Sequence, residues 1–326
     1  MASLKSTLIT FGKLGLAGAS ICAIAGIMAV YQPDGTIQDS QADILDMSFI
    51  ELSNSAKFAS ALDNLGHDEP QSFSINGNVV HFSVNYSRKH PRELMKDYQE
   101  EFVNQGLNKK AWTENNSFGT GDQMLLDGMT GGVVPTMKRG DEYYAMGGVV
   151  PANGADDEDG LLALGRSRDP DHRKVFKGHH FVEMFWDREK HRSTVTATWS
   201  DENFDYLKMV GAKGGDVDVD MEVPACPSCS RISRVRDLDP NRSYSSNVYS
   251  GTKNKRDLIG FYRKAMAKRG WVETESSSMF TKMRPFVEFQ GDEASFMQFT
   301  KGGRFLTIVG YPDKTGNTVI HTVLGI

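Results

Sequence analysis

The chain has 326 residues, 39% of them hydrophobic and 24% charged, which is enough apolar side chain to build folded cores and excludes global disorder. This length exceeds what one average domain needs, so two domains are the natural expectation. The formal net charge of −5 and the absence of a nucleic-acid-binding motif make DNA and RNA poor candidate partners.

The first predicted element is a membrane-spanning helix from Leu14 to Val30, in an uncharged run long enough to cross the hydrocarbon layer of a bilayer. Two lysines precede this run, whereas the residues just after it are acidic. The positive-inside rule then places the N-terminus in the cytoplasm and the rest of the chain outside it. We therefore predict a single-pass protein of a bacterial inner (cytoplasmic) membrane, with residues 1–31 as the anchor and the C-terminal body in the periplasm.

Other interpretations of this segment are a cleaved signal peptide and a lipid-attachment site. Small residues near Ala25 and Ala29 suit signal-peptide cleavage, after which the body would still be exported. Lipid attachment at Cys22 is less favoured because the bulky Ile21 precedes it. Small residues also recur at four-residue spacing, which lets two membrane helices approach closely and predicts self-association. They are Gly15, Ala19 and Ala23 in one series and Gly18, Cys22 and Gly26 in the other.

The soluble body contains a repeat, in which residues 92–107 align without a gap on residues 256–271. Both segments place apolar residues every four positions, as amphipathic helices do. Gly106 and Gly270 then stand where a helix commonly ends in a left-handed turn. A period-2 alternation over residues 80–87 predicts a strand before the first helix.

Later runs of β-branched and aromatic residues predict antiparallel strands after each helix, at 180–186, 193–199, 204–210, 271–275, 296–300, 305–311 and 318–324. We predict an α+β fold in which the transmembrane helix is followed by two tandem strand–helix–antiparallel-sheet units made by internal duplication. Chance similarity between two amphipathic helices is the alternative. The predicted order is a linker with a short helix at 32–68, unit one at 69–211, a linker with a cysteine pair at 212–241, and unit two at 242–326.

A glycine-rich insertion at about residues 115–174 lengthens the first unit. Loops of this size are usually functional or disordered, so we predict a partner-binding surface here, although a tolerated surface insertion is the alternative. A second candidate surface is the basic face of the later helix, which would suit an acidic protein or anionic lipids if it is more than a solvated face. The candidate contact residues are Met124, Met129, Tyr143 and Tyr144 in the insertion, and Arg256, Arg263 and Lys264 on the helix.

The sharpest chemical motif is Cys226-Pro-Ser-Cys229, which could form a disulfide, ligate a metal or exchange electrons. We predict the disulfide, because zinc lacks further ligands and a redox site would need a helix directly after the motif. The acidic residues from Asp216 to Glu222 lack the Gly and Glu positions of a calcium loop. His172, His179 and His180 lack the spacing of a metal motif.

No nucleophile elbow, phosphate-binding loop or dinucleotide fingerprint is present, so we predict no catalytic, cofactor-binding or metal-binding residues. The leading hypothesis is a non-catalytic, membrane-anchored binding or scaffolding protein outside the cytoplasm, whose partners are other envelope or membrane proteins. Two alternatives are an envelope enzyme, either a thiol-disulfide protein or a hydrolase, and a receptor for a small ligand.

Overall fold

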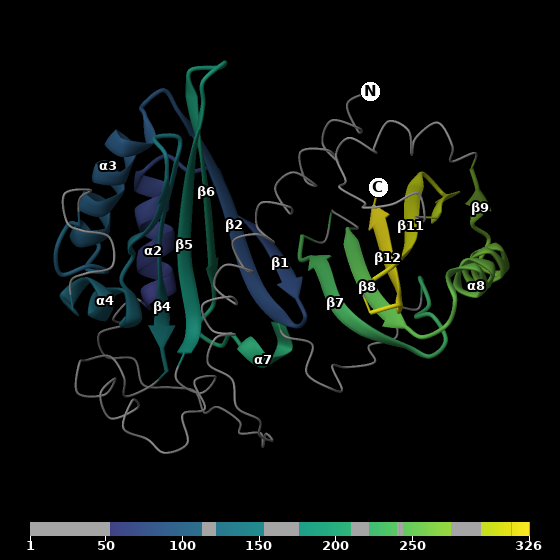
Figure 1. The fold of residues 1–326 in the computed structure, drawn as a ribbon. Coiled ribbons are helices and arrows are strands. Elements are labelled where there is room, and N and C mark those ends of the chain that lie inside the picture. Colours follow the sequence, from purple (N-terminus) through teal and green to yellow (C-terminus); the bar gives the residue numbers. More distant parts are fainter. Residues whose placement is uncertain are drawn as a thin grey trace. The chain divides into compact units, whose positions relative to one another are not determined.

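The computed structural model divides the chain into two compact units, which are drawn in Figure 1. Unit 1 consists of the described residues up to Pro70 together with His81–Phe204. Unit 2 consists of Gln71–Val80 and the described residues from Asp205 onward. The residues described are 53–112, 122–152, 176–209, 222–239, 241, 244–274, 295–313 and 315–325.

The predicted α+β fold class needs correction, because the structure is mostly antiparallel sheet with few helices. Twelve strands are present in the described ranges, and several of them have nine or more residues. Long runs of β-branched and aromatic side chains, which fit a pleated and half-buried surface, account for this predominance of strand. The predicted strand at 204–210 is also wrong, since α7 (Tyr206–Met209) is a short helix.

The membrane-related predictions need correction too. Across the ranges that the structure describes, no helix is long and apolar enough to cross a bilayer. The longest of these helices have 14 residues, whereas a spanning helix needs about 20. A single-pass inner-membrane protein with a periplasmic body is therefore not supported. The segment from Leu14 to Val30, on which that prediction depended, lies outside the described residues.

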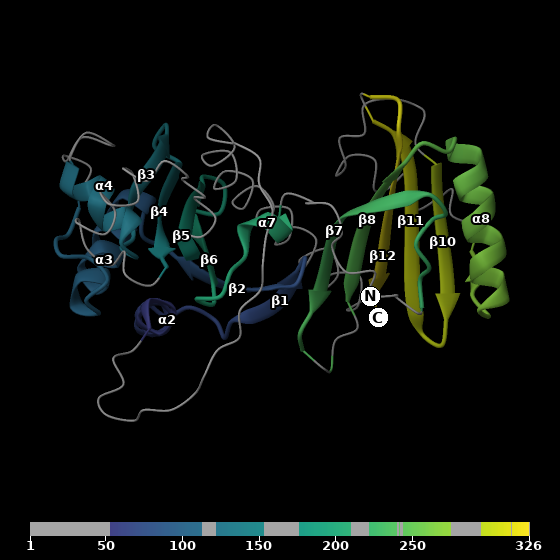
Figure 2. The same ribbon diagram turned by 90° about the horizontal axis from the view of Figure 1, so that it is seen from below.

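Unit 1 is a twisted sheet with helices on one face, as Figures 1 and 2 show. Its strands follow the order β3-β4-β5-β6-β2. The helices pack against β4, β5 and β6, and the core between them contains Phe58, Tyr98, Phe102 and Trp199. The elements are α2 (Asn54–Asn64), β2 (Asn78–Ser87), α3 (Pro91–Asn104), α4 (Asp122–Met129), β3 (Val134–Arg139), β4 (Tyr143–Pro151), β5 (Phe176–Asp187) and β6 (Arg192–Ser200).

Helix α3 confirms the first predicted amphipathic helix and its end signal. The ring of His90 accepts a hydrogen bond from the backbone N–H of Arg92, and Pro91 occupies the first turn, where its missing N–H costs nothing. Gly106 has a φ of +71° directly after the helix, a conformation that glycine adopts without steric cost.

A buried amide network fixes the start of β3 against α3. The side-chain N–H of Gln99 donates to the carbonyl of Val133 at 2.7 Å, and the Gln99 carbonyl oxygen accepts from the backbone N–H of Trp112 at 3.0 Å. Asn108 donates to the same Val133 carbonyl at 2.9 Å and accepts from its N–H at 2.6 Å. Gln99 is 0% exposed, so these bonds replace water for the groups that they pair.

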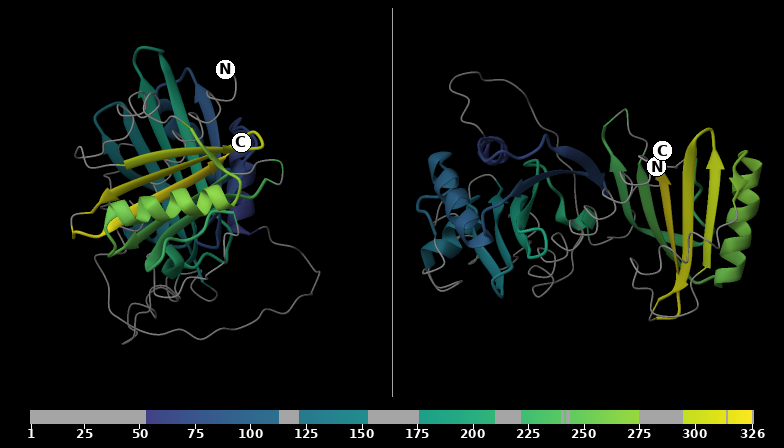
Figure 3. Two further views of the ribbon diagram at one scale, coloured as in Figure 1. Left: turned by 90° about the vertical axis from the view of Figure 1, so that its right-hand side faces the viewer. Right: turned by 90° about the horizontal axis from the view of Figure 1, so that it is seen from above.

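Unit 2 has the strand order β1-β7-β8-β12-β11-β10-β9, with the helix α8 along one face, as Figure 3 shows. The core beneath α8 includes Tyr262, Trp271, Phe299 and Ile308. Gly270 ends the helix with a φ of +76°, as predicted. The elements are β1 (Gln71–Ile75), β7 (Cys229–Asp237), β8 (Ser245–Gly251), α8 (Lys255–Lys268), β9 (Val272–Glu273), β10 (Ser295–Lys301), β11 (Arg304–Pro312) and β12 (Thr318–Gly325).

Strand β1 belongs to unit 2 although it comes early in the chain. Phe73 and Ile75 lie opposite Asp237 and Val235 of β7. The backbone N–H of Asn76 donates to the carbonyl of Arg234 at 2.8 Å, and Oδ1 of Asn76 accepts a hydrogen bond from the backbone N–H of Arg234 at 2.6 Å. Unit 2 therefore includes a strand that lies, in sequence, between the two segments of unit 1.

Cys226 and Cys229 form a disulfide immediately before β7, with their Cα atoms 5.4 Å apart. Cys226 is buried in the core of unit 2. Ser228, inside the small loop, has a φ of +63°, which is uncommon for a residue other than glycine.

We expect the double variant Cys226→Ser, Cys229→Ser to lower the free energy of unfolding of unit 2 by about 2 kcal/mol, the loop-closure value for so short a ring. Urea unfolding of the variant and of the oxidised parent measures this difference. The single variant Ser228→Gly is the control, because it relaxes the loop backbone while keeping the bond. A double variant as stable as the oxidised parent would contradict the expected contribution of the disulfide.

Candidate functional site

The sheet of unit 1 has two different faces. On β5, Val182 and Met184 point toward the helices and belong to the core. Successive side chains of a strand point to opposite faces, so Phe181, Glu183 and Phe185 point away from the helices. We call the side that carries these three residues the outer face of unit 1.

The strand register aligns side chains of the outer face in one row at one end of the sheet. Arg139 on β3 lies opposite Tyr143 on β4, and Tyr143 lies opposite Phe185 on β5. Phe185 in turn lies opposite Thr194 on β6. Directly opposed residues of an antiparallel pair have Cβ atoms about 5 Å apart, so each of these side chains meets the next.

Tyr86 on β2 and Arg192 on β6 extend this row. The guanidinium carbon of Arg192 lies 4.4 Å from the centroid of the Tyr86 ring, a close cation–π contact. We call the whole set the aromatic band, which consists of Tyr86, Arg139, Tyr143, Phe185, Arg192 and Thr194.

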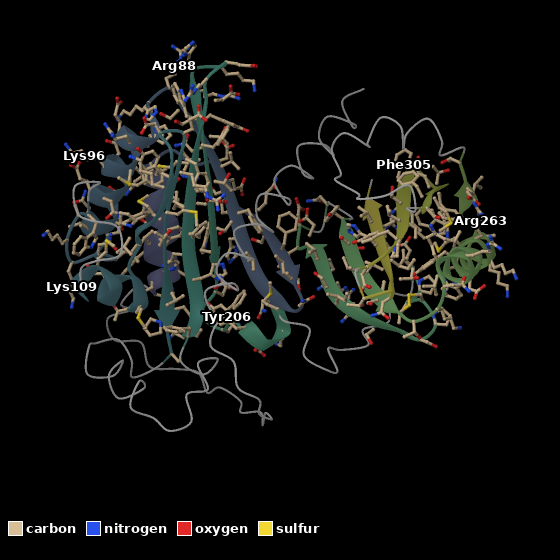
Figure 4. The ribbon with its side chains drawn as sticks, viewed as in Figure 1. Arg88, Lys96, Lys109, Tyr206, Arg263 and Phe305 are labelled. Carbon is tan, nitrogen blue, oxygen red and sulfur yellow. A yellow bond between two sulfur atoms is a disulfide. The ribbon has the colours of Figure 1, made fainter. Side chains whose placement is uncertain are left out.

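Two of the large rings in the aromatic band are exposed to solvent. Tyr86 is 49% exposed and Phe185 is 51% exposed. A single exposed apolar residue is ordinary on a protein surface, but here two exposed rings stand in one row of side chains, on β2 and β5, with β6 between them. Figure 4 shows the side chains at this end of unit 1 near the labelled Arg88, and it labels Phe305, an exposed ring of unit 2 that serves below as a control.

Hydrogen bonding and stacking hold the band's side chains in place. The Tyr143 hydroxyl donates to Oε1 of Glu183 at 2.6 Å. Burial raises the pKa of Tyr143, and the bond to Glu183 raises it further, so the hydroxyl is a neutral donor at physiological pH. The guanidinium of Arg139 lies 6.0 Å from the centroid of the Tyr143 ring. Tyr143 is thereby held from both sides.

At the other end of β5 the outer face is covered by Phe204, which follows β6 in the chain. The ring of Phe204 meets that of His179 edge to face at 5.0 Å, and His179 is only 1% exposed. Burial, and secondarily the neighbouring His180, lowers the pKa of His179 to about 3. Neither ring nitrogen of His179 has a hydrogen-bond partner. His179 is therefore a neutral side chain of the core.

His180 points to the opposite face from His179. Its ring stacks on Phe58 at 4.6 Å, and its Nδ1 lies 3.1 Å from the carbonyl oxygen of Gly131. Burial lowers its pKa to about 4. Two adjacent residues on opposite faces of a strand cannot ligate one ion together. His172 lies outside the described residues, among which no cluster of three or more His, Cys, Asp or Glu could hold a metal.

The structure separates the contact residues that we predicted in the insertion. Tyr143 belongs to the aromatic band, whereas Tyr144 points to the other face and is fully buried in the core. Met124 is buried in a small cluster with Trp112. Met129 is half-buried at the end of α4.

The predicted basic surface lies on α8 of unit 2. Arg256, Arg263 and Lys264 are all exposed there. Arg263 forms an ion pair with Glu273, with 3.1 Å between Nε and Oε1, so part of this charge is already neutralised. Surface pairs of this kind contribute little to stability.

The cysteine pair does not have the surroundings of a thiol-disulfide exchange site. Such sites usually place the first cysteine at the start of a helix, where the helix dipole stabilises the thiolate. Here β7 begins at Cys229, and Cys226 is buried. The disulfide therefore has a structural role, which is to close the short loop from Cys226 to Cys229.

The aromatic band is the one surface in the described parts of unit 1 where exposed rings and guanidinium groups meet. Comparisons with protein families, curated proteins and solved structures found no match. The function therefore has to be argued from this surface alone. Five residues of the band, all except Tyr143, were not candidates from the sequence. Tyr86, Phe185 and Thr194 lie in predicted strands, and these strands were a usable signal. Alternation gives two faces for each strand but does not say which face the helices cover.

Proposed function

We propose that this chain is a non-catalytic protein-binding or scaffolding module, and that the aromatic band is its contact surface. The observation that carries the proposal is the exposed row of aromatic and arginine side chains on adjacent strands. Tyrosine, phenylalanine and arginine are enriched at the centres of protein interfaces, and tyrosine and arginine dominate binding hot spots.

The rigidity of the band supports a binding role. Its residues stand on paired strands, and the contacts of Tyr143 and Arg192 restrict their side chains before any partner arrives. A preorganised surface loses less conformational entropy on association, so more of the contact free energy appears as affinity. The exposed part of Phe185 contributes nothing to the core, and its burial by a partner is favourable.

Site-specific photo-crosslinking tests this proposal. A benzophenone amino acid at position 185 is expected to crosslink a distinct protein partner in cell extract, and the same group at position 305 is not. Phe305 is a suitable control because it is 45% exposed on unit 2, far from the aromatic band in sequence. The partner is then purified, and its affinity for the parent chain is measured in solution.

The affinity measurement decides the outcome. Phe185→Ser and Tyr86→Ser are each expected to weaken binding of the purified partner by at least about tenfold, or ~1.4 kcal/mol, as hot-spot residues do. Phe305→Ser should leave the affinity unchanged. Equal affinities for all three variants would refute the aromatic band as the contact surface, provided that each variant keeps the parent melting temperature.

A further inference from the structure

We infer that the segment recognised by the aromatic band is an acidic peptide whose carboxylates pair with Arg139 and Arg192. This inference rests on the proposed function and specifies the chemistry of the partner. The relevant features are the stacking of the two guanidinium groups, their lack of carboxylate partners, and the apolar rings between them.

Each of the two guanidinium groups lies near a tyrosine ring and can still donate hydrogen bonds to a partner. The guanidinium carbon of Arg192 lies 4.4 Å from the centroid of the Tyr86 ring, and that of Arg139 lies 6.0 Å from the centroid of the Tyr143 ring. The N–H donors of a guanidinium lie in its plane and remain available when its flat side is stacked. A carboxylate matches this planar fork with two parallel hydrogen bonds.

Neither arginine has a carboxylate partner within the described part of the chain. Four neighbouring lysine and arginine side chains at this end of unit 1 do form ion pairs with carboxylates. The Nε of Arg192 is buried and lacks any hydrogen-bond acceptor. The neighbouring ion pairs join Lys89 to Asp97, Lys138 to Asp141, Arg188 to Glu142, and Lys190 to Asp187.

The local charge balance limits what the band can recognise. Glu183 lies one row from Tyr143 on the outer face, Asp187 lies directly opposite Arg192, and Glu189 lies in the turn between these two residues. Recognition of a carboxylate would therefore come from the positions of the two guanidinium groups and not from a net positive charge of the surface. With a formal net charge of −5, the chain is poorly suited to a polyanion such as nucleic acid. A peptide that alternates carboxylates with apolar side chains matches both the arginines and Phe185.

Selection from a random peptide display library tests the inference on the full chain. Peptides bound by the parent are expected to be enriched in Asp and Glu interspersed with apolar residues. The best of these peptides, made synthetically, should bind Arg139→Gln and Arg192→Gln about tenfold more weakly, a difference of ~1.4 kcal/mol. Arg263→Gln on α8 is the matched control and should bind like the parent, because its charge is already paired with Glu273.

Arg192→Lys separates charge from geometry. Lysine keeps the positive charge but lacks the planar fork, so we expect an affinity between those of the parent and Arg192→Gln. Raising the salt concentration should weaken binding of the acidic peptide to the parent more than to the double variant Arg139→Gln, Arg192→Gln.

The possible outcomes distinguish this inference from the proposed function. Enriched peptides that lack acidic residues but lose affinity for Phe185→Ser would overturn the acidic specificity while leaving the band as a binding surface. Peptides whose affinity is unaffected by both Phe185→Ser and the arginine variants would overturn both. Melting temperatures of all variants, measured in parallel, show that lost affinity does not come from lost folding.

Discussion

The free energy of unfolding of unit 1 is expected to fall steeply as the pH drops from 6.5 toward 4. Burial lowers the pKa of His179 from 6.5 to about 3, and it lowers that of His180 and of His67 to about 4. In this range the unfolded chain binds protons that the folded chain excludes, so stability is lost as the solution becomes more acidic. Stability is complete above pH 6.5, where these rings are neutral in both states.

The expected loss is on the order of 5 kcal/mol for His179 and His180 together, since one pKa unit corresponds to ~1.4 kcal/mol. That is comparable to the whole stability of a typical domain, so acid should unfold unit 1. Urea unfolding at a series of pH values measures the loss directly.

Two variants make this measurement specific. His179→Phe keeps an aromatic ring against Phe204 but removes the titrating group, so its stability should depend less steeply on pH between 4 and 6.5. His191→Asn is the matched control, because His191 is exposed in the β5–β6 turn at a positive φ that asparagine tolerates. If His179→Phe and the parent lost stability in parallel, buried His179 would not be a source of the acid sensitivity.

Replacing Gln99 by alanine is expected to destabilise unit 1 by about 3 kcal/mol, because it opens a cavity and leaves a buried N–H unpaired. The Gln99 side chain bonds both the Val133 carbonyl and the Trp112 N–H. Its loss should release the start of β3, the edge strand that carries Arg139 into the aromatic band. Urea unfolding gives the energy, and amide hydrogen exchange across β3 shows whether the loss is local.

Arg263→Ala provides the control for Gln99→Ala, because residue 263 occupies the same place in the repeated helix sequence. Arg263 is exposed, and its ion pair with Glu273 is a surface pair, so its removal should cost less than about 1 kcal/mol. If both variants lowered the free energy of unfolding by a similar amount, the buried amide network would contribute no more to stability than an exposed side chain does.

Local patterns in the sequence predicted the helices α3 and α8 and several strands. The apolar spacing around Tyr98 and Tyr262 indicated α3 and α8, and both rings are buried. Runs of β-branched and aromatic residues over 180–186 and 193–199 indicated β5 and β6. These signals are local and depend on the period of one element, which is why single-sequence reading captured them.

Long-range features could not be read in the same way. Strand β4 contains Met146, Gly147 and Gly148, so its alternation is weak, and it went unrecognised within the predicted insertion. Pairing of β1 with β7 joins residues more than 150 positions apart, and no local pattern specifies it. The aromatic band depends on how five strands, β2 to β6, lie beside one another, which is why only Tyr143 among its six residues was a candidate from sequence.

The most direct test of the central claim is amide hydrogen exchange of the chain, free and bound to the partner captured through position 185. Contact through the aromatic band should slow exchange at the ends of β4, β5 and β6 that carry Tyr143, Phe185 and Thr194, while α8 exchanges as in the free chain. Protection confined to α8 or to the sheet of unit 2 would contradict the assignment of the outer face of unit 1 as the binding surface.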